Sequence, residues 1–278
     1  MKSIKNSPDI WKTALPVLRA DMNKYDRGHI VILGGTDMTG AARLAADASM
    51  RAGCGVCTIV SSEDVKAIYL EGSPHIMFES YKDLSDFPAH LTDRRRNACI
   101  MGPGAGRKND GMLRQAVLAV LKMKKPVVLD ADALNIFEDR TEDLFHSLHD
   151  QCILTPHEGE FSRLFPSIEG SRQERASQAA HVTGAVVLLK GAETFICMPN
   201  GNMIINDHST PLLATAGSGD VLAGIIGGLL AQGMKPDTAS AAAAWIHGEA
   251  ALQFGAGLTA PDIIAKMPQV FKTLSGLL

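Results

Sequence analysis

The chain has 278 residues, of which 46% are hydrophobic and 21% are charged, enough apolar material for one large α/β domain or two small ones. A net charge of −3 and an isoelectric point near 6.3 argue against binding to nucleic acid or to an anionic membrane surface, since both need basic patches. The sequence has neither an apolar run of membrane-helix length nor the apolar core of a signal peptide, so we expect a cytoplasmic protein.

Apolar runs that are typical of strands alternate along the chain with segments of helical periodicity. The expected strands are residues 29–35, 56–60, 75–78, 98–102, 126–130, 152–155 and 185–191. Helices are expected between them, among others at 39–52, 111–125 and 171–182. The strand runs are continuously apolar, which indicates that both faces of the sheet are covered. Their alternation with helices predicts right-handed parallel crossovers.

The last third of the chain changes character. Residues 194–206 hold two short apolar runs around a Pro-Asn-Gly turn, which predicts a β-hairpin at the sheet edge. Two alanine- and glycine-rich helices are expected at 218–233 and 237–253, and a final helix after Pro261. No linker or repeat divides the sequence. We therefore expect residues 1–278 to form a single three-layer α/β/α domain with a mostly parallel central sheet.

Two local clusters in the sequence have plain structural interpretations. Cys54 and Cys57 form a C-x-x-C pair without the second pair that a metal site needs, so we expect small buried residues at a tight turn. The five cysteines are an odd, scattered set and suggest reduced thiols. The basic run Arg94–Arg96 precedes a strand and is expected to be a solvated turn.

Ligands of such sheets bind beyond the carboxyl ends of the strands, and the segment 215–220, TAGSGD, directly precedes a predicted helix. Gly217 and Gly219 allow positive φ and a close approach to a ligand. A helix start offers unpaired N–H groups and the positive end of the dipole to an anion. We expect Asp220, in the first turn, to be held ionised there and to take a proton from a hydroxyl that attacks a phosphoryl group. An interaction with the helix dipole alone explains the acid equally well.

The segment 154–160, LTPHEGE, places polar side chains at the end of another predicted strand. Glu158 fits a plain helix start, with acids in the first turn. His157 lies on the expected ligand side, where its ring can hydrogen-bond a substrate. Glu160 is a candidate for holding Mg²⁺ through water, because Mg²⁺ prefers to keep most of its hydration shell.

Three weaker candidates follow other strands. Lys190 can meet a phosphate as a point charge, or be a lysine at the sheet edge whose ammonium reaches into solvent. In LDADALN, Asp130 is a candidate to help hold Mg²⁺, and one of Asp130, Asp132 and Asn135 is expected to cap the short helix that follows. The segment GPGAGR at 102–107 is as compatible with a simple strand-to-helix turn as with ligand contact. No phosphate-binding motif of the form GxxxxGK[ST] is present.

Five segments, in this order, resemble the ribokinase-like superfamily and within it the ADP/ATP-dependent NAD(P)H-hydrate dehydratases. They are GHIVILGGTDMTGAARLAADASMRAG, VVLDADALN, ILTPHEGEFSRL, LLKGAETFI and TPLLATAGSGDVLAGIIGGLLAQG. The resemblance runs from about Leu18 to the C-terminus. It implies a ribokinase-like fold and phosphorylation of the ring hydroxyl of (6S)-NADHX or NADPHX, from ADP in bacterial members and ATP in eukaryotic ones. When ADP is the donor, this transfer releases AMP, and elimination of phosphate then restores NADH or NADPH.

The resemblance also implies roles for residues of this sequence, with Asp220 as the base that activates the ring hydroxyl. The implied contacts to the hydrated dinucleotide are Ala41, Gly104, His157 and Asp220. The implied nucleotide contacts are Lys190, Gly191, Ala192, Glu193, Thr194 and Gly219. The implied anion hole consists of the N–H groups of Gly217, Ser218 and Gly219. Glu160 falls at the acid position that the superfamily associates with Mg²⁺.

Partners also follow from the resemblance. Many bacterial relatives carry a fused epimerase domain of roughly 200 residues, more than one average domain, and the sequence shows none. A separate NAD(P)HX epimerase is therefore expected. Because relatives form tetramers, the resemblance also implies a homotetramer. Near the N-terminus, residues 23–28, NKYDRG, depart from the His-Lys pair that relatives often carry there.

Two other functions remain as alternatives. One is an ATP-dependent kinase of the same superfamily that phosphorylates a vitamin-precursor alcohol; such kinases tend to carry Asn where this chain has His157. The other is a nucleotide-sensing module without activity, because a fold does not fix a function. A sensor would be expected to lose the base, and Asp220 is present.

Overall fold

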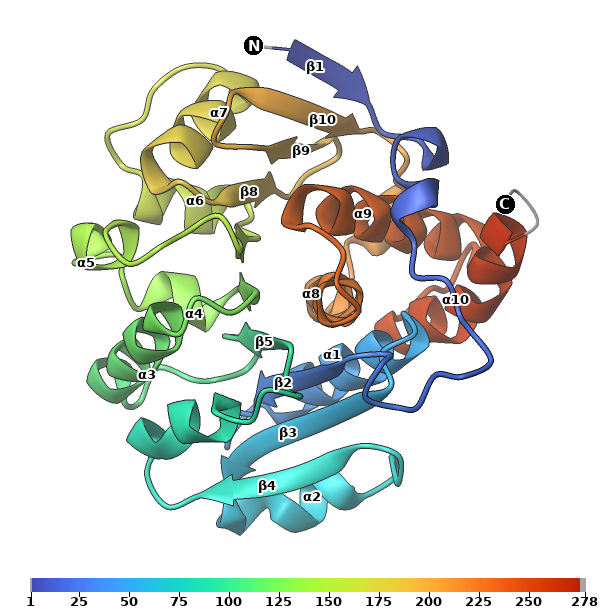
Figure 1. The fold of residues 1–278 in the computed structure, drawn as a ribbon. Coiled ribbons are helices and arrows are strands. Elements are labelled where there is room, and N and C mark those ends of the chain that lie inside the picture. Colours follow the sequence, from blue (N-terminus) through green and yellow to red (C-terminus); the bar gives the residue numbers. More distant parts are fainter. Residues whose placement is uncertain (1, 276–278) are drawn as a thin grey trace.

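A computed structural model describes residues 2–275 and places ten strands in one sheet (Figure 1). The strand order is β1-β10-β9-β8-β7-β6-β5-β2-β3-β4. The strands are β1 (Lys2–Lys5), β2 (His29–Leu33), β3 (Val56–Ser62), β4 (Met77–Tyr81), β5 (Ala98–Met101), β6 (Val127–Leu129), β7 (Cys152–Leu154), β8 (Val186–Leu189), β9 (Thr194–Cys197) and β10 (Asn202–Asn206).

Neighbouring strands from β4 to β8 pair in parallel, as the continuously apolar runs predict. The hairpin β9–β10 is antiparallel, with Ile196 opposite Ile204. It does not form the edge itself, because β1 pairs in parallel with β10 and is outermost. All four residues of β1 are exposed, so the sequence carries no apolar pattern that would have predicted this strand.

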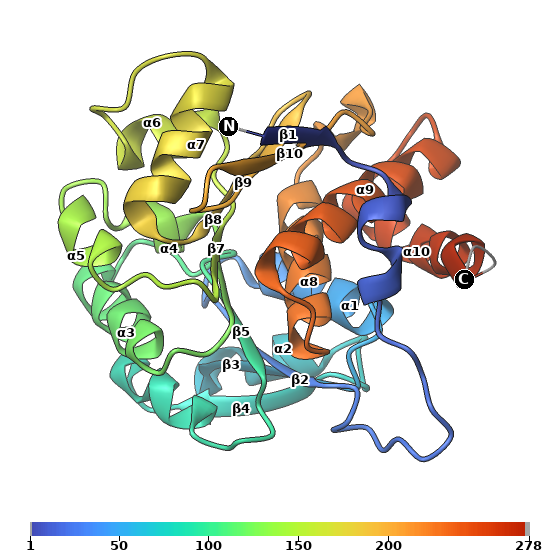
Figure 2. The same ribbon diagram turned by 45° about the horizontal axis from the view of Figure 1, so that its top comes forward.

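The helices cover both faces of the sheet (Figures 1 and 2). They are α1 (Thr39–Arg51), α2 (Lys66–Leu70), α3 (Asp110–Lys122), α4 (Asp132–Asn135), α5 (Thr141–Phe145), α6 (Glu158–Leu164), α7 (Arg172–Thr183), α8 (Ser218–Ala231), α9 (Pro236–Phe254) and α10 (Ala260–Ser275). Short 3-10 turns lie at Pro8–Ile10, Lys12–Ala14, Glu63–Val65, Leu84–Leu91 and Pro211–Leu213.

Two hydrophobic cores lie on opposite faces of the sheet. Side chains alternate across a strand, so Ile30 and Ile32 of β2 pack with α1, α8, α9 and α10 on one face. Val31 and Leu33 pack with α3 to α7 on the other face. This arrangement confirms the three-layer α/β/α architecture with a mostly parallel sheet.

Two local expectations can now be compared with the structure. All five cysteines are free and buried, and burial raises the pKa of Cys54 and Cys57, which supports a packing role for the pair. Arg96 does not fit a solvated turn: its side chain is 12% exposed and its guanidinium binds Glu79 and the carbonyl of His90. Among residues 2–275, no helix is both long and apolar enough to span a bilayer.

Candidate active site

The start of α8 lies beside residues that directly follow parallel strands. A Cβ atom at Gly219 would lie 3.6 Å from the Nζ of Lys190, which follows β8 and binds Asp130 at the end of β6. Gly217 precedes the helix with φ of +85°, a conformation that favours glycine. A Cβ atom there would also come within 2.5 Å of the Leu44 side chain on α1. The amide of Ser218 donates to the carbonyl of Thr215 at 3.3 Å, whereas the amides of Gly219 and Asp220 have no acceptor in the described part of the chain. These two amides are therefore open to an anion at the helix start.

Asp220 lies in the first turn of α8 and is half-buried. Burial, together with the negative charges of Asp130 and Asp132 and against the positive charge of Lys190, raises the pKa of its carboxyl to about 7. Asp220 is therefore ionised only in part near neutral pH, less than the sequence suggests, because its burial favours the neutral form. A carboxyl whose pKa lies near the working pH is well matched to accept a proton.

Lys190 follows β8 and faces the start of α8. Its Nζ lies 2.8 Å from Asp130 Oδ1 and 3.8 Å from Glu160 Oε2. Burial opposes the charge, but the carboxylates of Asp130, Glu160 and Asp220 outweigh it and raise the pKa of Lys190. The interpretation as a snorkelling lysine at the sheet edge is wrong, because β8 lies inside the sheet and the side chain is only 20% exposed.

The backbone between Asp130 and Asp132 is unusual. Ala131 has φ of +47° and ψ of −116°, which L-residues rarely adopt and which costs on the order of 1–3 kcal/mol. Ala131 is also the residue that precedes α4, and no side chain caps this helix, so the expectation of a polar cap was wrong. Asp130 instead binds Lys190, and Asp132 Oδ2 accepts from the amide of Gly106 at 2.9 Å.

His157 caps α6 with its ring. Nδ1 accepts from the amides of Gly159 and Glu160 at 3.0 and 3.3 Å, and the Glu160 carboxylate accepts in return from the His157 amide at 2.8 Å. Because Nδ1 accepts, the neutral ring carries its proton on Nε2. The side chain is 54% exposed and lines the cavity described below, and Nε2 lies 3.4 Å from Glu160 Oε1. This N–H can therefore reach either Glu160 or a ligand.

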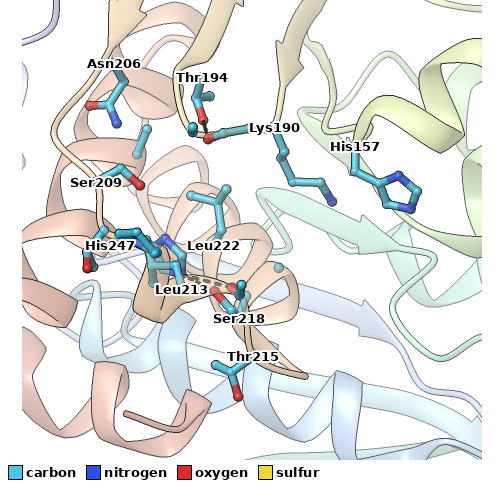
Figure 3. A pocket seen from close by; sticks show the side chains of 17 residues that line it. His157, Lys190, Thr194, Asn206, Ser209, Leu213, Thr215, Ser218, Leu222 and His247 are labelled. Carbon is cyan, nitrogen blue, oxygen red and sulfur yellow. Dashed lines mark hydrogen bonds between the residues drawn. The ribbon is translucent and has the colours of Figure 1, made fainter. Parts of the chain in front are cut away.

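A cavity of about 640 Å³ opens beside the start of α8 (Figure 3). His157 and Lys190 lie at one end, and Asn206 and Ser209 lie at the other. The remaining lining comes from Gly191, Ala192, Thr194, Thr210, Pro211, Leu213, Ala214, Thr215, Ser218, Gly219, Leu222, Ala244 and His247. Five of the six expected nucleotide contacts therefore line one cavity, and the sixth, the exposed Glu193, lies in the same loop without lining it.

Of the expected dinucleotide contacts, His157 lines the cavity, and Ala41 and Gly104 lie together at the first turn of α1. A Cβ atom at Gly104 would come within 3.0 Å of the Cβ of Ala41 and within 2.3 Å of the Met38 carbonyl, so Gly104 and the first turn of α1 are in close contact. Neither Ala41 nor Gly104 lines the cavity. Gly217 packs against Leu44, one turn further along α1, and Ser218 and Gly219 line the cavity, so the α8 start borders both α1 and the cavity.

The donors for a metal ion are few. No group of three or more His, Cys, Asp or Glu side chains is placed to hold a metal within residues 2–275. Asp130 is bound to Lys190, and Glu160 is engaged in the α6 cap. These residues fit Mg²⁺ that is held mainly by phosphates and waters, with a protein carboxylate in contact through water.

Sequence reasoning missed two side chains of the site. Arg172, at the start of α7, donates to the carbonyls of Lys190 at 3.0 Å and Glu193 at 3.3 Å. These two hydrogen bonds hold the loop between β8 and β9 in place. His247 on α9 contacts Ser218 and lines the cavity. Both residues belong to segments whose helical periodicity indicates packing only. The one sequence feature that could have pointed to the site is that His247 is a histidine within an alanine-rich helix.

The fold and the site together indicate a class of protein. A three-layer α/β/α sheet, with a glycine-rich helix start and an aspartate beside a nucleotide-sized cavity, has the architecture of ribokinase-like enzymes. A family model described as NAD(P)H-hydrate dehydratase matches residues 29–269. The chain belongs to the NAD(P)H-hydrate dehydratase family.

Individual proteins of known sequence or structure are also similar to this chain. An ADP-dependent (S)-NAD(P)H-hydrate dehydratase of Neisseria meningitidis serogroup B is 38% identical over 86% of this chain and 82% of its own length. A bifunctional NAD(P)H-hydrate repair enzyme of Moorella thermoacetica is 37% identical over 95% of this chain, which spans only 53% of that protein. The crystal structure of the ADP/ATP-dependent NAD(P)H-hydrate dehydratase from Bacillus subtilis, co-crystallised with ATP/Mg²⁺, aligns with a TM-score of 0.82 at 29% identity and covers 96% of this chain and 97% of that one.

Proposed function

We propose that this chain dehydrates (6S)-NADHX and NADPHX to NADH and NADPH with ADP as phosphoryl donor, which yields AMP and phosphate. The observation that carries the proposal is the position of Asp220. Its carboxyl stands at the helix start that borders both the cavity with Lys190 and α1, the helix on which Ala41 lies next to Gly104. A base at such a boundary can serve a hydroxyl on one side and a phosphoryl group on the other.

In this proposal the two sides hold different molecules. Lys190, Gly191, Ala192, Glu193, Thr194 and Gly219 hold the nucleotide on the cavity side. Ala41 and Gly104, outside the cavity, and His157, at the end of the cavity beside Lys190, hold the hydrated dinucleotide, with the Nε2–H of His157 as a donor. Of the expected anion hole, the amides of Gly217 and Gly219 surround the transferred group, whereas the Ser218 amide already donates to the Thr215 carbonyl. The Asp220 amide takes its place, because it has no acceptor within the described residues.

The chemistry proceeds in two steps. The oxygen of the C6 hydroxyl attacks the terminal phosphoryl group of ADP while Asp220 accepts the hydroxyl proton, and AMP leaves. The C6–O bond then breaks and phosphate departs with the bonding electrons. The adjacent ring carbon gives its proton to water or to the departing phosphate, which restores the double bond. Lys190 and the helix-start amides stabilise the negative charge on the transferred group. Mg²⁺, when bound with the nucleotide, neutralises phosphate charge, and Glu160 is the proposed water-mediated contact.

Further parts of the proposal rest on the family resemblance. ADP is the proposed donor because the Neisseria relative is ADP-dependent, although the Bacillus enzyme is named for ADP and ATP. A separate NAD(P)HX epimerase is proposed to act on the same substrates. A homotetramer in the cytoplasm is the proposed assembly and location, and residues 1–278 are proposed to act as one domain.

The test is recovery of dihydronicotinamide absorbance from NADHX with ADP and Mg²⁺. We expect the wild type to restore the absorbance and Asp220→Asn to lose about 100-fold or more of the rate, because the variant cannot accept the proton. Replacing ADP with ATP compares the two donors. No recovery with either nucleotide would contradict the proposal, and phosphoryl transfer to a hydroxymethylpyrimidine or thiazole alcohol would then favour the kinase alternative.

A further inference from the structure

His247 is a buried histidine that forms part of the cavity wall. It lies on α9, only 6% exposed, and Ala244, one turn earlier, lines the same cavity. Its Nε2 lies 3.0 Å from the carbonyl oxygen of Ser218 and 3.2 Å from the Ser218 hydroxyl (Figure 3). The ring is thus fixed against the first residue of α8.

The contact with Ser218 determines the tautomer of the ring. A carbonyl oxygen only accepts hydrogen bonds, so Nε2 must carry the proton that it donates. Burial lowers the pKa of His247 to about 4, so the ring is neutral at physiological pH. Nδ1 therefore carries a lone pair and acts as an acceptor.

This acceptor has no partner in the described part of the protein. Both hydrogen bonds of the ring use Nε2. Nδ1 is also not among the unpaired atoms sealed from solvent, which within residues 2–275 belong to Arg27, Arg96, Asp110 and His149. It is therefore open to the cavity that the ring lines, and a ligand there gains by bringing a donor to it.

The surroundings of His247 match the nucleoside part of a nucleotide. Leu213, Leu222 and Ala244 give the cavity apolar surface for a sugar and a flat base. Lys190 and the open amide of Gly219 also line this cavity, and the proposed function assigns them to the phosphates of the nucleotide. A nucleoside offers few donors that could reach an acceptor in such a wall: the ribose hydroxyls and, in adenine, the exocyclic amine.

We propose that His247 Nδ1 accepts a hydrogen bond from a ribose hydroxyl or the exocyclic amine of the donor nucleotide, which makes His247 a specificity-determining residue. The inference rests on the proposed function, since it takes the cavity as the nucleotide site. It assigns two tasks to one ring: Nε2–H holds the carbonyl of Ser218, and Nδ1 selects the nucleoside.

The test compares four nucleotides by calorimetric titration of the wild-type protein: ADP, 2′-deoxy-ADP, 3′-deoxy-ADP and inosine diphosphate. Each analogue lacks one donor. We expect one analogue to bind about 5- to 100-fold more weakly than ADP, because the loss leaves a buried acceptor without a partner. Which analogue loses affinity identifies the group that Nδ1 contacts.

Two variants assign this effect to His247. The amide nitrogen of Gln reaches the position of Nε2, so His247→Gln keeps the bond to Ser218 and removes the Nδ1 acceptor. It is expected to bind all four nucleotides with similar affinity. The amide oxygen of Asn reaches the position of Nδ1, so His247→Asn is expected to retain part of the discrimination. Thermal melting of both variants verifies that they fold.

The outcomes separate this inference from the proposed function. Equal binding of all four nucleotides by the wild type, or unchanged discrimination in His247→Gln, would overturn the role of His247 and leave the dehydratase proposal intact. Failure of the wild type to bind ADP or ATP at all would overturn both.

Discussion

At the scale of single residues, the ionisation of Asp220 governs the proposed chemistry. Burial, assisted by Asp130 and Asp132, raises the pKa of Asp220 to about 7. The base acts only when it is ionised, so kcat/KM is expected to fall about tenfold per pH unit below pH 7 and to level off above it. Initial rates of NADHX dehydration between pH 5.5 and 8.5 measure this profile.

Asp132→Asn is the matched control for this prediction. The variant removes one negative charge near Asp220 but keeps a side-chain oxygen that can accept from the Gly106 amide. The acid limb of the profile is expected to move to lower pH by a fraction of a unit, because a like charge no longer opposes ionisation. An acid limb that is absent, or that stays in place in this variant, would argue against Asp220 as the titrating base.

At the scale of secondary-structure elements, glycines set how closely α8 approaches α1. A Cβ atom at Gly224 would lie 2.4 Å from the Ala45 carbonyl oxygen, and one at Gly228 would lie 2.6 Å from that of Ser49. The Ser49 hydroxyl also lies 2.9 Å from the Gly224 carbonyl oxygen. Residues four apart share a helix face, so these glycines make one contact surface that sets how closely α8 packs against α1.

Gly224→Ala is therefore expected to lower stability, whereas Gly219→Ala is expected to lower ADP affinity. Gly224→Ala forces the two helices apart and is expected to lower the free energy of unfolding by about 1–3 kcal/mol. A Cβ atom at Gly219 meets only the Lys190 ammonium, at 3.6 Å, so stability is expected to stay within about 0.5 kcal/mol while ADP affinity falls at least about tenfold. Urea unfolding and ADP titration measure both quantities. Equal stability losses, or wild-type ADP affinity in Gly219→Ala, would contradict this account.

The elements that could be predicted from the sequence are those whose own residues carry the signal. The buried strands β2, β3 and β5 are continuous apolar runs, and TAGSGD combines glycines with an acid at a helix start. β1 could not be predicted, because its exposed residues become a strand only through pairing with β10. His247 and Arg172 were missed for a related reason: their partners, Ser218 and the carbonyls of Lys190 and Glu193, are distant in sequence.

At the scale of the whole molecule, Asn6 joins the N-terminal segment to the wall of the cavity. Its side chain is 2% exposed and donates to Asn206 Oδ1 and to the Ala241 carbonyl, each at 2.8 Å. Its Oδ1 accepts from the Trp11 indole at 3.0 Å. Asn206 lines the cavity, and Ala241 belongs to α9, the helix that carries His247. The N-terminal segment thus supports a site formed by residues some 200 positions away.

Asn6→Ala is expected to destabilise the whole domain and weaken nucleotide binding together. Three buried hydrogen bonds are lost at about 1 kcal/mol each, which corresponds to a fall in Tm of roughly 5–10 °C. ADP affinity is expected to fall as well, because Asn206 and α9 lose a common anchor. The control Asn202→Ala changes an exposed asparagine on the same strand, β10, and is expected to leave Tm and affinity unchanged. If Asn6→Ala lowered Tm but bound ADP like the wild type, the N-terminal segment would stabilise the fold without shaping the cavity, because the same two elements would then hold their positions without Asn6.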